Sequence, residues 1–244
     1  MAHTLTALEL FLILCAGIIP PLIWLWFWLK EDSKRPEPRN LLILSFFCGA
    51  LAVIFVLPLQ ALSNKLLSPG LVLLLAWATI EELAKLGVAF AVDFRKRTYD
   101  EPVDSMIYLV TVALGFAAFE NVLFLFKSMS ESGVNISIIT ASMRFIGATL
   151  LHVFSSAILG GFMALGYCKS RRQKFVYLLA GILVASALHT LFNFFIMNEV
   201  IIEGTGNILA VFAMLWVGII LLLVFFEKVK TITCQINTVN LNKG

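Results

Sequence analysis

Seven ionisable residues lie within stretches of this chain that are otherwise strongly apolar. They are Glu81, Glu82, Lys85, Glu120, Arg144, His152 and His189. A charged side chain at the centre of a membrane helix costs about 2.5–3.5 kcal/mol on insertion scales. The charged members of the set together cost on the order of 10 kcal/mol unless they are paired or hydrated. Carboxylates and imidazoles kept at such positions can move protons or bind a metal ion, so the sequence indicates a functional site inside a membrane.

The spacing of these residues is helical. Lys85 follows Glu81 by four residues and Glu82 by three, so it can pair with either carboxylate. Glu81 and Glu82 point about 100° apart around a helix, which predicts different roles for the two acids. His189 and Asn193 share one helix face at a spacing of four residues.

The elements that must position these residues follow from the composition. Apolar residues make up 60% of the 244 positions, charged residues only 14%, and the mean hydropathy is +0.96. Soluble domains keep about a quarter of their residues charged, so this chain is solvated mostly by lipid. No basic run is interleaved with aromatic residues, and we therefore expect no nucleic-acid partner.

Seven segments have the length of about 20 apolar residues that a helix needs to cross the hydrocarbon core. They lie at roughly 7–29, 41–62, 69–92, 103–127, 137–167, 175–197 and 207–226. Helices satisfy their own backbone hydrogen bonds in lipid, and the sequence therefore predicts an all-α polytopic bundle. The fifth segment is long for a single crossing, and we expect it to tilt or protrude.

Basic residues alternate between the connecting segments. Those that follow the odd-numbered spans carry Lys30, Lys34, Arg35, Arg39, Arg95, Lys96, Arg97, Lys169, Arg171, Arg172, Lys174, Lys228, Lys230 and Lys243. The other connections hold only Lys65 and Lys127. The positive-inside rule then predicts an outside N-terminus and a cytoplasmic C-terminus. We expect one transmembrane domain over residues 1–227 and a short cytoplasmic tail over 228–244.

The four cysteines show no metal spacing and imply no disulfide framework.

The polar residues share a depth in the predicted bundle. At 1.5 Å per residue, Glu81 and Glu82 lie roughly 17 Å below the outer end of the third segment. Glu120, followed by Asn121, lies roughly 10 Å below the outer end of the fourth segment, and His189 roughly 12 Å below that of the sixth. The residues therefore occupy one slab, from the membrane midplane into the outer leaflet. A single cluster is the simplest interpretation.

Each polar residue also has a purely structural interpretation. Glu81 and Lys85 can form a structural ion pair, Arg144 can serve as counter-ion for Glu120, and Asn193 can join two helices. A proton- or ion-coupled transporter would also place such residues at the midplane. Transporters usually contain paired repeats with matching broken helices, whereas prolines interrupt only the first two segments here.

Four motifs in order along the chain resemble those of a known family. They are Glu81-Glu82-Leu83-Ala84-Lys85 (EExxK), Phe116 to Glu120-Asn121 (FxxxEN), Arg144 with His152, and His189 to Asn193 (HxxxN). The loops with Asp32, Pro36-Glu37-Pro38 and Glu101-Pro102-Val103-Asp104 look like further family features. The set resembles the PrsW family of intramembrane proteases, which is distantly related to the CAAX-prenyl proteases. The resemblance covers roughly residues 16–200.

The resemblance implies an enzyme of the bacterial plasma membrane that acts in regulated proteolysis. The implied substrate is a single-span anti-sigma factor, cut on its extracytoplasmic side in the first cleavage step that releases a sigma factor. The residues themselves support the location, because a polar slab biased toward the outer leaflet suits cleavage near that face.

Hydrolysis inside a membrane needs water, a base and donors to the oxyanion. We expect Glu82 or Glu81 to be the base, with Lys85 holding the charge of the pair. His152, His189 and Glu120 would complete a metal or water site, and Asn193 or Arg144 would donate to the oxyanion. The two histidines with the carboxylates of Glu81, Glu82 and Glu120 can satisfy Zn²⁺, which is the expected cofactor. Asn121, beside Glu120, completes the nine expected site residues. A glutamate-activated water without metal is the alternative, since the HExxH signature is missing from the sequence.

Overall fold

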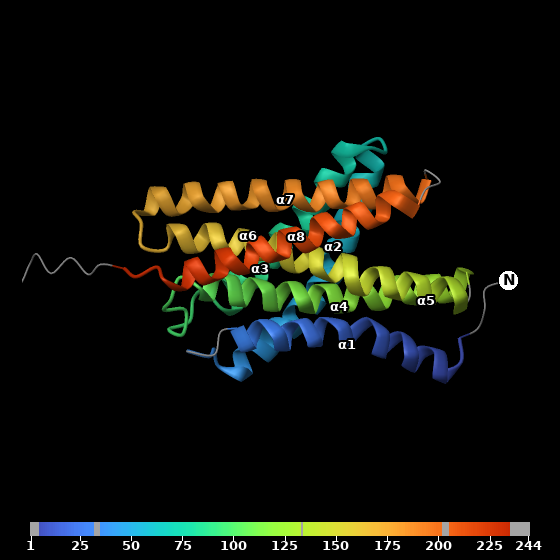
Figure 1. The fold of residues 1–244 in the computed structure, drawn as a ribbon, viewed down its shortest axis with the longest axis horizontal. Helices are drawn as coiled ribbons and strands as arrows, with labels where there is room; N and C mark the ends of the chain where they lie inside the picture. Colours follow the sequence, from blue (N-terminus) through green and yellow to red (C-terminus); the bar gives the residue numbers. More distant parts are fainter. Residues whose placement is uncertain (1–4, 32–34, 133, 202–204, 235–244) are drawn as a thin grey trace, which may run out of the picture.

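The computed structural model describes residues 5–31, 35–132, 134–201 and 205–234, and all regular structure in these ranges is helical. The helices are α1 (Ala7–Glu31), α2 (Arg39–Leu66), α3 (Leu71–Val92), α4 (Asp104–Ser132), α5 (Val134–Met143), α6 (Thr149–Gly166), α7 (Arg171–Ile201) and α8 (Thr205–Lys230). They run alongside one another in a single elongated bundle (Figure 1). The all-α prediction is therefore confirmed for the described residues.

The distribution of polar and apolar side chains is the reverse of that in a soluble protein. On the outside of the bundle, Phe55 is 74% exposed and Leu183 is 70% exposed. In the interior, Glu82 and Lys85 are both 0% exposed. An apolar exterior around a charged interior is stable only where the exterior meets lipid.

Five helices among the described residues are long and apolar enough to span a membrane. They are Ala7–Lys30, Arg39–Leu66, Asp104–Glu131, Thr149–Gly166 and Arg171–Phe195. Helix α3 is also 22 residues long, but its middle carries Glu81, Glu82 and Lys85. The chain is thus a multi-pass membrane protein, and the count of seven spans stays a prediction.

The long fifth segment is not one continuous α-helix. Helices α5 and α6 are joined by a π-helical turn over Arg144–Ala148. A π-turn inserts one extra residue into a helix and turns the side chains that follow it, and such turns are frequent at functional sites. The Thr149 hydroxyl donates to the Arg144 carbonyl oxygen at 3.0 Å and helps to satisfy the widened turn.

Helix α4 lies in the middle of the bundle and packs closely against α2 and α6. A Cβ atom at Gly115 would lie 1.9 Å from the Phe46 carbonyl oxygen, and one at Gly49 would lie 2.2 Å from that of Val112. Glycine at these two positions lets the backbones of α2 and α4 approach, as small residues do between membrane helices. The close contact aligns the polar residues of α4 with those of its neighbours.

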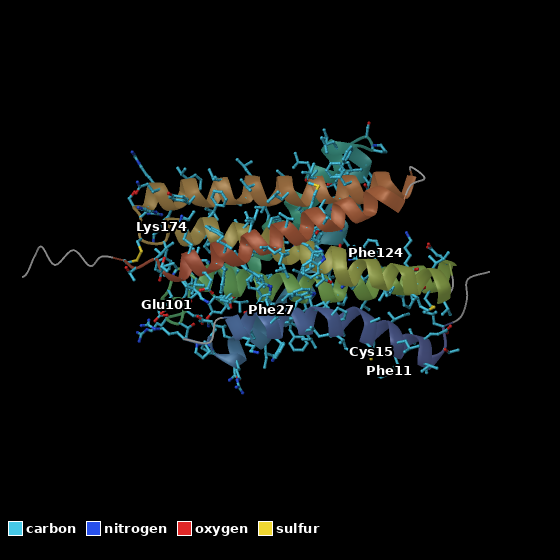
Figure 2. All side chains as sticks on the ribbon, viewed as in Figure 1. Phe11, Cys15, Phe27, Glu101, Phe124 and Lys174 are labelled. Atoms are coloured by element: carbon cyan, nitrogen blue, oxygen red, sulfur yellow. A yellow bond between two sulfur atoms is a disulfide. The ribbon has the colours of Figure 1, made fainter. Side chains whose placement is uncertain are left out.

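The basic connections share one end of the bundle. Figure 1 shows that the α1–α2, α3–α4 and α6–α7 connections lie at the same end as the C-terminal end of α8. In Figure 2, Glu101 and Lys174 mark this end, whereas Phe11 and Cys15 lie toward the other. The arrangement agrees with the alternation of basic residues in the sequence, and which end faces the cytoplasm stays a prediction.

The same end carries a disulfide that the cysteine spacing did not predict. Cys168, directly after α6, is bonded to Cys234, 66 residues later. The expectation that the cysteines form no disulfide was wrong. It rested on the spacing of the cysteines along the sequence, which does not show which distant segments meet in the fold. The end of α8 returns beside the α6–α7 connection, which brings the two residues within 5.3 Å between their Cα atoms.

We expect cysteine labelling to place this basic end in the cytoplasm. In a variant without the native cysteines, Glu131→Cys should react with an impermeant reagent added outside, and Arg172→Cys should react only after the membrane is opened. Both positions are exposed in the structure, so burial does not limit the reaction. The reverse pattern of labelling would overturn the predicted orientation.

Candidate active site

The Glu82 carboxylate on α3 is the most heavily bonded group of the interior. Its Oε1 lies 2.7 Å from Lys85 Nζ and 2.9 Å from both Ser155 Oγ and His189 Nδ1, and its Oε2 accepts from Ser156 Oγ at 2.9 Å. Both oxygens are therefore occupied. This arrangement fixes Glu82 in place and leaves it little freedom to accept a further proton.

Helix α4 and the π-turn form a second set of contacts. The Arg144 guanidinium donates to Glu120 Oε2 at 2.6 Å and to Asn121 Oδ1 at 2.7 Å. Asn121 in turn donates to Thr149 Oγ1 at 3.1 Å. The guanidinium also lies 4.0 Å from the ring centroid of Phe124, which is labelled on α4 in Figure 2. The Arg144 and Glu120 side chains are 14% and 19% exposed, so the site opens at this edge.

The two histidines lie between these carboxylates, with ring centroids 5.2 Å apart. His189 Nδ1 is 2.9 Å from Glu82 Oε1, and His152 Nε2 is 3.0 Å from Glu120 Oε2. An ionised carboxylate only accepts hydrogen bonds, so each of these ring nitrogens carries the hydrogen. The lone pairs of the neutral rings are then on His189 Nε2 and His152 Nδ1. Lys85 Nζ, at 2.9 Å from His152 Nδ1, donates to that lone pair.

Both lone pairs face Glu81. Its Oε1 accepts a hydrogen bond of 2.8 Å from Gln60 Nε2 on α2. Its Oε2 is buried and accepts no hydrogen bond from the described residues. This oxygen lies 3.6 Å from His189 Nε2 and 3.9 Å from His152 Nδ1.

Glu81, His152 and His189 together have the composition of a metal-binding site. One ligand atom from each lies within 4.8 Å of the others, and all three residues are buried. A buried carboxylate oxygen without a partner is unfavourable unless a cation or a water completes it. Catalytic zinc sites use three such protein ligands and keep a fourth position for water or substrate. The residues therefore fit a divalent metal ion.

The structure brings eight of the nine residues proposed from the sequence into this one network. They are Glu81, Glu82, Lys85, Glu120, Asn121, Arg144, His152 and His189. The ninth, Asn193, is half-buried on α7 and makes no side-chain hydrogen bond with the described residues.

Four residues that hydrogen-bond to the network were not predicted as members of the site, namely Gln60, Thr149, Ser155 and Ser156. Neutral polar side chains are common in membrane helices, so none of them stands out as an ionisable residue does. The one sign of Gln60 in the sequence was a polar amide side chain inside the otherwise apolar second predicted span.

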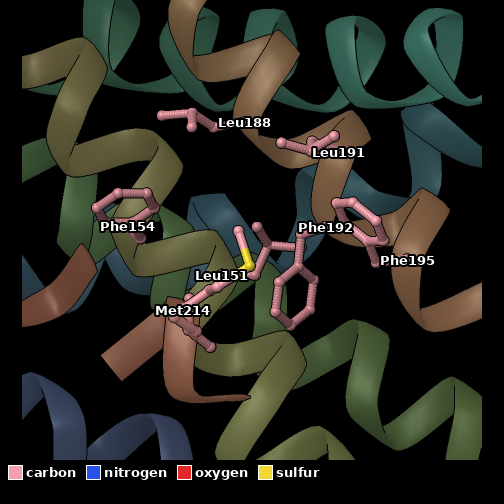
Figure 3. Close-up of a pocket in the computed structure, with 8 residues that line it drawn as sticks. Leu151, Phe154, Leu188, Leu191, Phe192, Phe195 and Met214 are labelled. Carbon is pink, nitrogen blue, oxygen red and sulfur yellow. The ribbon is translucent and has the colours of Figure 1, made fainter. Parts of the chain in front are cut away.

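An apolar pocket of about 160 Å³ lies between α6, α7 and α8 (Figure 3). It is lined by Leu151, Phe154, Leu188, Leu191, Phe192, Phe195, Met214 and Leu215. Phe154 and Leu191 each follow a histidine by two residues, which places them about 200° around the helix from it. These two lining residues therefore lie on the sides of α6 and α7 that face away from the histidines.

The fold and the site together define a multi-pass membrane protein with a buried carboxylate–imidazole centre suited to hydrolysis. The chain belongs to the PrsW family: residues 37–224 match the family described as "PrsW family intramembrane metalloprotease". It is therefore an intramembrane protease.

Three relatives, each named "Protease PrsW", illustrate the similarity. The protein of Geobacillus kaustophilus is 25% identical over 211 residues, which cover 85% of this chain and 88% of the relative. The Bacillus subtilis relative is 26% identical, covering 76% of this chain and 83% of its own. For the Clostridioides difficile relative the identity is 27%, with 79% and 81% covered. No solved structure matches the chain.

Proposed function

We propose that this protease is a zinc enzyme whose metal ligands are Glu81 Oε2, His152 Nδ1 and His189 Nε2. With zinc bound, Lys85 would release the His152 Nδ1 lone pair and keep its bond to Glu82 Oε1. The observation that carries the proposal is the buried Glu81 Oε2, which faces two imidazole lone pairs and accepts no hydrogen bond from the described residues. Zinc in this position would supply a Lewis acid that polarises the scissile carbonyl and makes water more nucleophilic.

The residues around the ligands have distinct roles in this proposal. Glu82 and Glu120 hold the N–H groups of His189 and His152, and so fix the tautomer and orientation of each ring. Glu120 Oε1 makes no hydrogen bond with the described residues, so Glu120 can also accept the proton of the attacking water. Arg144 pairs with Glu120 at the open edge, where its guanidinium can donate to the oxyanion. Asn193, on the same face of α7 as His189, is the alternative donor.

We further propose the substrate and setting that the resemblance implies. The substrate is a single-span anti-sigma factor in the bacterial cell membrane, cut on its extracytoplasmic side in the first step of sigma-factor release. The depth of the site supports membrane cleavage: Glu81 lies ten residues into α3, roughly 15 Å from its N-terminal end. Residues 1–227 would form the protease domain. Of the proposed cytoplasmic tail, 228–244, residues 235–244 lie outside the described residues.

The test is metal analysis of the detergent-purified protein, run beside cleavage of candidate single-span substrates. We expect about one zinc ion per chain and loss of cleavage on treatment with a chelator, restored by adding zinc. Cleavage that proceeds at full rate in protein without metal would overturn the zinc assignment. In that case Glu81 Oε2 is the base that activates water. A cut on the cytoplasmic side of the substrate would overturn the proposed position of cleavage.

A further inference from the structure

Helix α2 contributes one side chain to the site, and it belongs to none of the four motifs. Gln60 is half-buried, and its Nε2 donates to Glu81 Oε1 at 2.8 Å. Because this bond occupies Oε1, the carboxylate is held with Oε2 directed toward His152 and His189. The orientation of Glu81 therefore depends on a neighbouring helix.

The packing of α2 against α3 explains why Gln60 reaches this position. Val53 and Val56 of α2 lie in an apolar cluster with Ile80 and Ala84 of α3, directly around Glu81 in the sequence. Gln60 is one turn beyond Val56 on α2, so the same packing carries its amide to the carboxylate. An amide can hold a carboxylate without adding a further charge to the membrane interior.

Each proposed ligand then has a partner on the side away from the metal position. Glu82 supports His189, Glu120 supports His152, and Gln60 supports Glu81. Residues that orient metal ligands in this way typically contribute 10–100-fold in metal affinity or activity when they are mutated. The first two are charged and lie in the recognised motifs, whereas Gln60 is neutral and lies outside them.

We propose that Gln60 is a positioning residue, which holds Glu81 so that a single carboxylate oxygen, Oε2, faces the metal. The inference rests on the proposed zinc site. Without the amide the carboxylate can rotate, bind through both oxygens or turn away from the histidines. Gln60 bonds Glu81 Oε1, which is not one of the three proposed metal-ligand atoms.

The test compares metal affinity in purified variants, using competition with a coloured chelator and the absorption spectrum of the Co²⁺ form. Gln60→Met keeps the length of the side chain but removes the donor, and we expect metal affinity to fall about 10–100-fold with an altered Co²⁺ spectrum. Gln60→Asn keeps an amide on a shorter side chain, so its loss should be smaller. Ser63→Ala is the matched control, because Ser63 is one turn away on α2 and its hydroxyl donates to the Leu59 carbonyl oxygen of the same helix.

Three outcomes are informative. If wild-type protein binds metal and Gln60→Met binds it equally well with an unchanged spectrum, the role of Gln60 is refuted while the metal site stands. If Gln60→Asn loses more affinity than Gln60→Met, Gln60 acts through packing, and the inference is again overturned. If wild-type protein binds no metal, the zinc site itself fails and the inference fails with it.

Discussion

Glu81→Gln should abolish proteolysis while leaving the protein folded. Gln keeps the size of the side chain, and its carbonyl oxygen can still accept the bond from Gln60, so we expect the free energy of unfolding to change by no more than about 1 kcal/mol. The neutral amide is a much weaker metal ligand than a carboxylate and cannot accept a proton from water. Loss of either function predicts a fall in cleavage rate of about 10²–10⁴-fold.

The measurement is cleavage of a single-span substrate in detergent, with metal content determined on the same samples. Glu227→Gln is the matched control: it makes the same chemical change at an exposed position near the end of α8, where Glu227 pairs with Lys230. Metal loss together with activity loss supports Glu81 as a ligand. If the wild-type protein contains no metal and Glu81→Gln still loses activity, the result supports Glu81 as the base. Wild-type cleavage by Glu81→Gln would make the glutamate purely structural and refute both mechanisms.

The sequence predicted the members of the site well because charge inside a membrane is costly and therefore informative. Glu120 and His152 are 32 positions apart along the chain. Both could still be predicted as site residues, because a charged or titratable group in an apolar helix is costly and usually functional. Their common depth followed from the rise of a helix. The structure adds their direct contact, at 3.0 Å between His152 Nε2 and Glu120 Oε2.

The sequence could not assign roles within the adjacent pair Glu81 and Glu82. Their 100° separation predicts different surroundings, but which of them faces the histidine lone pairs depends on the rotation of α3 about its axis. Side-chain packing against α2 and α7 sets that rotation. The contribution of Gln60, the π-turn at Arg144 and the Cys168–Cys234 disulfide likewise depend on how distant segments meet in three dimensions.

Glu82→Gln should destabilise the fold, in contrast to Glu81→Gln. Lys85 is fully buried, and its Nζ lies 2.7 Å from Glu82 Oε1. Replacing the carboxylate by an amide leaves this ammonium without its closest counter-charge, and breaking a buried ion pair from one side costs about 3–5 kcal/mol. We expect a lower yield from the membrane and a clearly lower unfolding temperature in detergent, measured beside wild-type protein and Glu81→Gln.

A second substitution separates this loss of stability from the loss of chemistry. In Glu82→Gln with Lys85→Met the buried charge is removed together with its partner, and exchanging both members of a buried pair for neutral residues is often close to neutral for stability. The double variant should therefore regain most of the stability that the single variant loses. It should still bind metal about 10–100-fold more weakly, because His189 Nδ1 then faces an amide in place of a carboxylate. If Glu82→Gln alone is as stable as wild-type protein, or if the double variant is no more stable than the single one, the buried Lys85–Glu82 pair does not stabilise the fold.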